Sequence, residues 1–147
     1  MAVDFGTKRI GLAVSDALGI TAQGLPTRVR TRIDADLRHI QDLTLEYSVE
    51  LVLVGNPISK TGEATPMSKS AAGFAEKLAR RIGCPVQLWA ERLTTAEAMR
   101  VLRDSGIGIE KRRLARDRVA AALLLQSYLD FHDNERIRNS SAGPVQP

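Results

Sequence analysis

The hydrophobic residues of this chain follow two different spacings, which divide it into predicted strands and helices. Short apolar runs bounded by glycine, proline or polar turns predict strands at residues 2–5, 9–15, 25–30, 50–54 and 86–89. Apolar positions that recur every three or four residues predict helices at residues 33–47, 66–82 and 117–131. Thr94 or Thr95 is predicted to cap one more helix, which runs to Arg103. Beyond residue 131 the periodicity is lost, so we expect one domain at residues 1–131 and a disordered tail at 132–147.

The order of these elements predicts an α/β fold built on a mixed five-stranded sheet. The first three strands follow one another closely and form an antiparallel meander, whereas the last two are reached through helices and add in parallel. Helices are expected on both faces of this sheet. Ligands of such sheets bind beyond the carboxyl ends of the parallel strands. Asp4, Gly55 and Glu91 each follow a predicted strand at that end, so we expect them at one edge.

Composition narrows the classes of function without choosing one. The net charge of +4 and the pI of about 9.6 allow a polyanionic partner, whereas an aromatic content of 4% argues against a base-stacking platform. A single cysteine excludes an internal disulfide and fits a reducing cytoplasm. We see no signal peptide and no apolar stretch long enough for a membrane, so we expect a cytoplasmic protein. With two histidines and no Cys/His cluster, any metal is expected to be a hard cation bound by oxygen.

Residues 4–16 contain the most distinctive candidate chemistry. Asp4 ends the first strand, and a glycine turn with Lys8 and Arg9 at its tip leads into the second strand. Gly6 and Gly11 lack a Cβ, which permits a tight turn or the close approach of a phosphate or a neighbouring chain segment. A carboxylate beside glycine and two cations suits a metal ion with a phosphodiester. The alternative interpretation is an ordinary hairpin with a polar tip.

Three carboxylates are predicted to converge at the sheet edge: Asp4, Glu91 after the last strand, and Asp117 at the start of the last helix. Such a group repels itself unless a cation neutralises it. Two Mg²⁺ ions about 4 Å apart fit that need and would activate water for in-line attack on a phosphate. The alternatives are that Asp117 is a favourable helix-start charge and that Glu91 pairs with Arg92.

Basic residues lie next to each of these acidic positions. Lys8, Arg9 and Arg92 are predicted to hold phosphates of the substrate. The basic run at residues 111–118 surrounds Asp117, and its alternative interpretation is a solvated face. The polar segment 59–65 has no periodicity and is predicted to be a mobile loop that closes over substrate.

With these residues in hand, the chain resembles the YqgF/RuvX family, whose fold is that of RNase H and the RuvC resolvases. The likeness runs from about residue 3 to 129. It is carried by Asp-Phe-Gly-Thr-Lys-Arg-Ile-Gly-Leu-Ala-Val-Ser-Asp at 4–16, Val-Gly-Asn-Pro at 54–57, Gly62, Glu-Arg-Leu-Thr-Thr at 91–95, and Asp117 with Ala120-Ala121.

The resemblance implies an RNase H-like nuclease that processes the 5′ end of pre-16S ribosomal RNA with Mg²⁺ or Mn²⁺. Asp4, Glu91 and Asp117 would then form the catalytic, metal-binding triad. A Holliday junction resolvase acting on branched DNA is the rival function, and the protein would be a monomer or a homodimer. A non-catalytic RNA-binding factor of ribosome assembly is a third hypothesis. An actin-like ATPase would need two such domains, more than 147 residues hold.

Two departures from the family pattern bear on this site. The family usually has aspartate where this chain has Ala90, so a missing ligand would weaken metal binding. Only three residues precede Asp4, fewer than is usual for the family, and we hypothesise that the natural start lies upstream or that the product is trimmed. An intact mass that matches Met1 in protein from its own host would refute that hypothesis.

Overall fold

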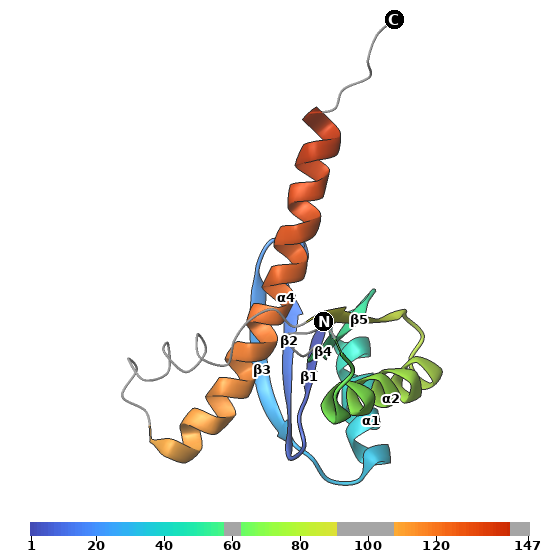
Figure 1. The fold of residues 1–147 in the computed structure, drawn as a ribbon, viewed down its shortest axis with the longest axis vertical. Coiled ribbons are helices and arrows are strands. Elements are labelled where there is room, and N and C mark those ends of the chain that lie inside the picture. Colours follow the sequence, from blue (N-terminus) through green and yellow to red (C-terminus); the bar gives the residue numbers. More distant parts are fainter. Residues whose placement is uncertain (58–62, 91–107, 142–147) are drawn as a thin grey trace, which may run out of the picture.

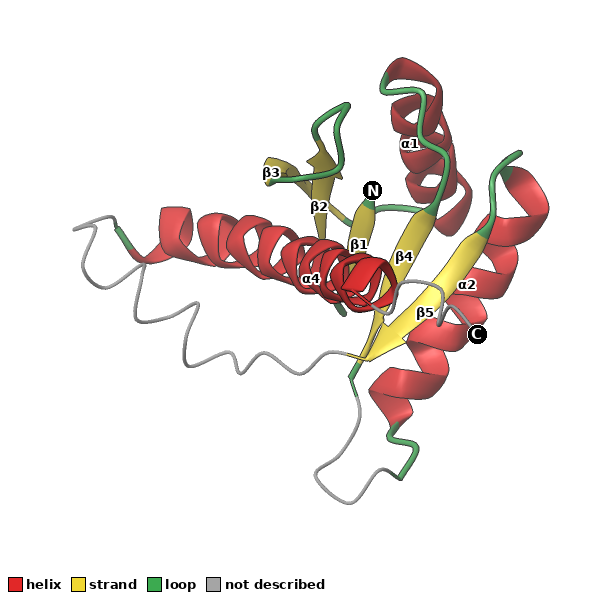
Figure 2. Cartoon of the chain, turned by 90° about the horizontal axis from the view of Figure 1, so that it is seen from above, coloured by secondary structure: helices red, strands yellow, loops and turns green. Residues whose placement is uncertain are grey.

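A mixed sheet of five strands forms the centre of the molecule, in the order β3-β2-β1-β4-β5. The computed structural model describes residues 1–57, 63–90 and 108–141. The strands are β1 (Ala2–Phe5), β2 (Arg9–Ser15), β3 (Ala22–Val29), β4 (Val52–Asn56) and β5 (Val86–Ala90). The helices are α1 (Ile33–Glu46), α2 (Pro66–Arg81) and α4 (Ile109–Ser141). Helices α1 and α2 cover one face of the sheet and α4 crosses the other (Figures 1 and 2).

Strand pairing confirms the predicted topology. β1 pairs antiparallel with β2 and parallel with β4, while β2 pairs antiparallel with β3 and β4 parallel with β5. β1 and β2 have the predicted bounds, whereas β3 begins earlier than predicted and β4 is shifted toward Asn56. The carboxyl ends of β1, β4 and β5 therefore share one edge, where Asp4, Asn56 and Ala90 lie.

Two hydrophobic clusters, one on each face, hold the helices to the sheet. The larger one packs α1 and α2 against residues such as Val3, Ile10 and Val54. The smaller one packs α4 against alanine side chains of β1 and β2, with Leu124 and Leu125 on the helix. Because alternate strand residues point to opposite faces, Asp4 shares the α4 face with Ala2. The sheet thus directs Asp4 toward α4.

Helix α4 is longer than the sequence predicted at both ends. The basic run after Gly108 is helical, and the helix continues to Ser141, so the prediction of a disordered tail is wrong for residues 132–141. Every side chain from Asp130 to Ser141 is exposed, so this part needs no apolar face, and hydrophobic periodicity cannot detect it. The predicted helix at 94–103 and most of the predicted loop at 59–65 lie outside the described residues.

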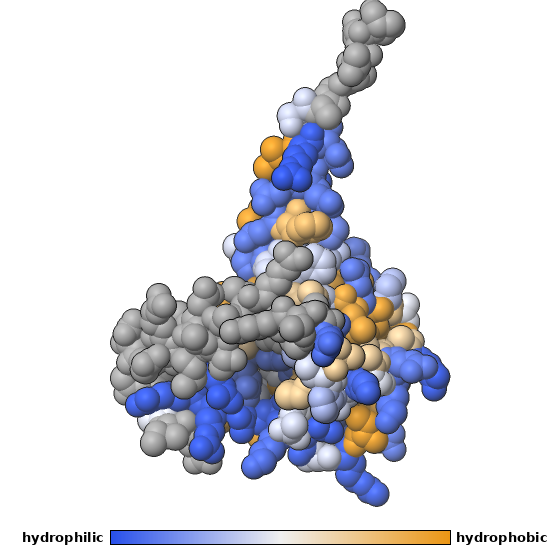
Figure 3. All heavy atoms as spheres, viewed as in Figure 1, coloured by the Kyte–Doolittle hydropathy of each residue, from blue (hydrophilic) through white to orange (hydrophobic). Residues whose placement is uncertain are grey.

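The projecting end of α4 is largely hydrophilic, with scattered hydrophobic side chains (Figures 1 and 3). Phe131 and Ile137 are the large apolar residues exposed there. Nearer the sheet, Trp89 of β5 packs edge-on against Tyr128 and donates a 3.1 Å hydrogen bond to the Ser127 hydroxyl. These contacts fasten α4 to the edge strand. None of the described helices is both long enough and apolar enough to span a bilayer.

Asp36 in the first turn of α1 is fully buried, which the sequence did not lead us to expect. Its Oδ1 accepts hydrogen bonds from Arg28 Nε at 3.0 Å and from the Thr31 amide at 3.2 Å, and its Oδ2 lies 4.0 Å from Arg30 Nε. Negative charge in the first turn of a helix is ordinarily explained by the helix dipole alone. Asp36 instead neutralises two arginines at the end of β3.

We expect Asp36→Asn to lower the free energy of unfolding by about 2 kcal/mol. Removing one partner of a buried ion pair costs about 3–5 kcal/mol, but the Arg28 and Arg30 side chains are 23% and 29% exposed and can regain water. Urea denaturation measures the loss. Asp34→Asn, at an exposed position in the same turn, is the matched control and is expected to change stability by less than about 1 kcal/mol. Equal effects of the two variants would contradict this account of Asp36.

Candidate active site

Asp4 lies at the carboxyl end of β1, in surroundings that disfavour its charge. The pKa of Asp4 is raised from 3.8 to about 6, chiefly by burial and also by the negative charge of Asp117, while the positive charge of Arg116 partly opposes both effects. Keeping such a carboxyl group charged near neutral pH costs folding free energy. A raised pKa of this kind is characteristic of functional sites. The structure therefore brings together two of the three predicted carboxylates, Asp4 and Asp117.

Gly11 is the reason that these two carboxylates can meet. Gly11 is paired with Asp4 across the β1–β2 ladder, and a Cβ built on Gly11 would collide with the backbone carbonyl oxygen of Asp117 and stand 2.9 Å from its carbonyl carbon. Helix α4 thus lies directly on the backbone of β2 at this point. The sequence suggested that Gly6 or Gly11 lets a phosphate or chain segment approach, and for Gly11 that segment is α4.

Asp117 also forms the main ion pair of the site. Arg9 Nε donates a 2.6 Å hydrogen bond to Asp117 Oδ2, and Arg116 Nε lies 3.9 Å from Oδ1. The alternative interpretation of Asp117, a charge at a helix start, is wrong because α4 begins at Ile109. Arg9 lies at the predicted place, but its Nε is engaged by a carboxylate of the protein rather than free for phosphate.

The other predicted site residues divide into two groups. Lys8 is exposed at the tip of the β1–β2 turn, where it can meet a substrate. Glu91 and Arg92 lie outside the described residues. Ala90, directly before Glu91, ends β5 opposite Asn56. Asp16 proves to be a turn residue, as predicted: its Oδ1 accepts hydrogen bonds from the amides of Ile20 and Thr21 at 2.7 and 3.2 Å.

The donor set at Asp4 and Asp117 fits a hard divalent cation. Carboxylate oxygens are the ligands that Mg²⁺ and Mn²⁺ prefer, and a cation would relieve the repulsion that raises the pKa of Asp4. Among residues 1–57, 63–90 and 108–141, no three His, Cys, Asp or Glu side chains lie close enough together to hold a metal ion. The described part of the chain thus supplies two carboxylates, with Glu91 the predicted third.

The raised pKa of Asp4 predicts how metal-free stability depends on pH. Because its folded pKa of about 6 exceeds its ordinary 3.8, the native state holds this proton more tightly than the unfolded chain. The contribution of Asp4 to the free energy of unfolding is fully present below about pH 4 and is lost as the pH rises through 6. The loss amounts to at most roughly 3 kcal/mol.

In EDTA, Asp4→Asn should therefore become more stable than the wild type as pH rises from about 4 to 7. Urea denaturation at several pH values measures the difference in free energy of unfolding between the two proteins. The other carboxylates are common to both proteins, so their titration does not affect this difference. A difference that does not change with pH would show that Asp4 titrates normally.

The family is decided by comparison with known proteins. Residues 1–131 match the RuvX family, described as Holliday junction resolvase. The chain belongs to the RuvX family. Its relatives include proteins named "Putative pre-16S rRNA nuclease" from Myxococcus xanthus and Koribacter versatilis. They are 42% and 44% identical over 90% and 92% of this chain and 87% and 89% of their own. A relative of the same name from Moorella thermoacetica is 44% identical over 88% of this chain and 93% of its own. The RuvX resemblance is thereby confirmed, and this is a family of nucleases.

Solved structures confirm the RNase H-like fold expected of RuvX proteins. The structure of Thermus thermophilus RuvC superposes with a TM-score of 0.55 at 14% identity, covering 90% of this chain and 94% of RuvC. The fowlpox virus Holliday junction resolvase gives a TM-score of 0.51 at 19% identity, covering 87% of this chain and 95% of the viral protein. Identities this low show a shared fold, and the site has to be argued from this chain's own residues.

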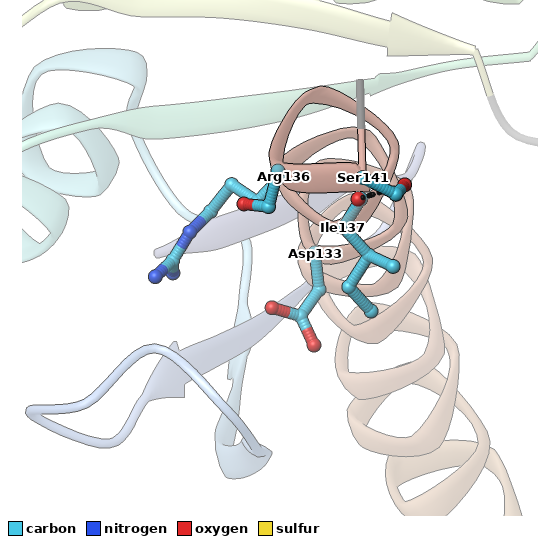
Figure 4. A pocket seen from close by; sticks show the side chains of 5 residues that line it. Asp133, Arg136, Ile137 and Ser141 are labelled. Carbon is cyan, nitrogen blue, oxygen red and sulfur yellow. Dashed lines mark hydrogen bonds between the residues drawn. The ribbon is translucent and has the colours of Figure 1, made fainter. Parts of the chain in front are cut away.

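A surface hollow in the described structure lies far from this site (Figure 4). Its lining residues all belong to the projecting end of α4: Asp133, Arg136, Ile137, Ser140 and Ser141. At 1.5 Å per residue, Asp133 lies about 24 Å along the helix from Asp117. Because its lining within the described part of the chain comes from one exposed helix, we assign the hollow no part in the chemistry at Asp4.

Sequence reasoning missed Arg116 as an individual member of this site. It was included only in the basic run around Asp117, although its charge lowers the pKa of Asp4. It also missed Asp36, for which a signal existed. Asp36 follows Ile33 by three positions and precedes Ile40 by four, which places it on the buried face of α1. A carboxylate on an apolar helix face predicts a buried partner.

Proposed function

We propose that this RuvX protein is a divalent-metal-dependent endonuclease that cleaves structured RNA at the 5′ end of pre-16S rRNA. The observation that carries the proposal is the meeting of Asp4 and Asp117 over Gly11, with Arg9 in contact with Asp117. Two half-buried carboxylates beside arginine at the carboxyl edge of a sheet form a site for a cation and a phosphate. Glu91 is proposed as the third carboxylate of this site.

Each residue has a proposed role in cleavage. Asp4 and Asp117 hold the cation, one from the sheet and one from α4. When bound, Mg²⁺ or Mn²⁺ would neutralise these carboxylates and polarise the phosphodiester for attack by water. Lys8, Arg9 and Arg92 hold phosphates of the cleaved strand, with Lys8 at the exposed tip of the turn. Arg9 and Arg116 keep positive charge beside Asp117, where the charge on the phosphate grows.

The choice of substrate rests on the three relatives described above, whose names refer to pre-16S rRNA. The basic balance of the chain suits RNA and DNA equally. The second candidate function is the resolution of four-way DNA junctions, which is favoured by the family's description and by the RuvC structures. Both functions use the same site residues, and they differ in the nucleic acid that enters.

One assay tests the proposal and separates the candidates. The purified protein is incubated with RNA spanning the 5′ end of 16S rRNA, with a four-way DNA junction, and with a linear duplex of the same sequence, each with Mg²⁺ or EDTA. We expect Mg²⁺-dependent cleavage of the RNA at a defined position. Preferential cleavage of the junction over the linear duplex would establish the resolvase function instead. Failure to cut any of them would contradict a nuclease and favour a non-catalytic assembly factor.

A further inference from the structure

Arg30 holds the turn between β1 and β2, although nothing in the sequence marks it as part of the site. Its backbone amide donates to the Lys8 carbonyl at 2.9 Å. Its Nη1 donates to the carbonyls of Gly6 and Thr7 at 3.0 and 3.1 Å. Three consecutive carbonyls of the turn therefore accept hydrogen bonds from one residue. The turn and the chain that leaves β3 lie at the same end of the sheet (Figure 1).

The guanidinium of Arg30 is itself fixed on two sides. Its Cζ lies 4.4 Å from the centre of the Phe5 ring, and that ring stacks on Phe74 with centroids 4.2 Å apart. Its Nε lies 4.0 Å from Oδ2 of the fully buried Asp36. Neither of these two atoms has a hydrogen-bond partner in the part of the chain that the structure describes, so charge and stacking orient the group.

We propose that Arg30 is a positioning residue that fixes the Gly6–Lys8 turn so that Lys8 and Arg9 present their charges together to a nucleic-acid phosphate. A glycine-containing turn between two strands is flexible by itself. Holding its carbonyls removes that freedom before binding, so less entropy is lost when the substrate arrives. The inference rests on the proposed function, because it assigns phosphate binding to the turn.

The chemistry requires arginine at this position. The guanidinium donates to two neighbouring carbonyls from its Nη1 while its plane lies over an aromatic ring and its Nε faces a carboxylate. Lysine keeps the charge but has no planar group to stack on the ring and no second nitrogen to face the carboxylate. Arg30→Lys therefore separates a positioning role from direct contact with a phosphate, for which lysine would serve almost as well.

The test is a double-mutant cycle on RNA binding. The wild type, Arg30→Lys, Lys8→Ala and the double variant are titrated in EDTA with labelled RNA spanning the 5′ end of 16S rRNA, across a range of salt concentrations. We expect Arg30→Lys to weaken binding several-fold and to reduce the slope of log K against log salt by about 1, as Lys8→Ala does. The double variant should lose no more RNA affinity than the single variant that binds more weakly, because both changes act through the turn.

Binding by Arg30→Lys at wild-type strength would overturn the inference, as would additive losses in the double variant. Hydrogen exchange adds a readout that needs no nucleic acid. In Arg30→Lys, the amides of residues 6–9 should exchange faster while the core of β2 stays protected, and unchanged exchange at the turn would equally overturn the inference. Failure of the wild type to bind or cut any nucleic acid would instead refute the proposed function, and with it the phosphate-binding role of the turn.

Discussion

Asp4→Asn is expected to abolish cleavage while leaving the protein folded. Asparagine has nearly the same shape as aspartate but no charge, so the site loses one of the two carboxylates that the structure brings together. A cation at such a site stabilises the transition state by several kcal/mol, and about 4 kcal/mol corresponds to a thousandfold in rate. We therefore expect kcat to fall about a thousandfold or more at saturating Mg²⁺. The assay is single-turnover cleavage of the RNA that the wild type cuts.

Asp16→Asn is the matched control for this variant. Asp16 lies at the other end of the β1–β2 hairpin, where its Oδ1 accepts hydrogen bonds from the amides of Ile20 and Thr21. Its replacement perturbs a surface turn and should leave the cleavage rate within about twofold of the wild type, as expected for a surface change remote from the site. An Asp4→Asn protein as active as the wild type would refute the assignment of Asp4. Equal loss in both variants would point to damage to the hairpin.

Gly11→Ala is expected to reduce cleavage about a hundredfold, although Gly11 carries no chemistry. A methyl group at this position would collide with the carbonyl oxygen of Asp117, and the backbone of a helix cannot rotate aside as a side chain can. Helix α4 must shift away from β2 and take the Asp117 carboxylate with it. Displacements of about 1 Å at a catalytic group can cost a hundredfold in rate. Mn²⁺ affinity should fall together with the rate.

Gly24→Ala provides the matched control, because it adds the same methyl group beneath the same helix. The Cβ at Gly24 would meet chiefly Cγ and Cδ of Arg118, which belong to a flexible side chain, and would stand 3.3 Å from the Arg118 carbonyl oxygen, a tight contact that a shift of a few tenths of an ångström relieves. Arg118 can change rotamer at the cost of its 3.1 Å hydrogen bond to the Leu25 carbonyl. We expect a modest loss of stability and nearly unchanged cleavage. The role proposed for Gly11 fails if both variants lose cleavage in parallel or if neither does.

The sheet was predictable from the sequence because its signals are local. β1 and β2 are apolar runs that end at glycine or polar turns, and their bounds were predicted as observed. The bounds of α4 were not, because its beginning is a basic run without apolar periodicity and its last part, residues 130–141, is exposed. Hydrophobic periodicity arises where a helix packs against a core, so it gives no signal for a helix that is surrounded by solvent. Length and helix propensity alone could not extend the prediction past residue 131.

The candidate site was predictable in its residues but not in its contacts. Asp4 was chosen because it follows a strand, and Asp117 because it lies near a predicted helix start. The predicted topology alone was enough to place the two carboxylates close together. The close approach of α4 to Gly11 and the pairing of Arg9 with Asp117 depend on how α4 crosses the sheet, which no local pattern encodes. The Arg30 contacts join segments more than twenty residues apart and were invisible for the same reason. The roles of Glu91 and Arg92 stay predictions.

The proposed nuclease activity requires that Asp4 and Asp117 bind one cation between them. Calorimetric titration with Mn²⁺ in the absence of nucleic acid tests it directly, using the wild type, Asp4→Asn, Asp117→Asn, the double variant and Asp16→Asn as control. We expect each single variant to lose most of the Mn²⁺ affinity and the double variant to lose little more, because both carboxylates bind the same ion. Wild-type affinity in either single variant, with Asp16→Asn also unchanged, would contradict this expectation.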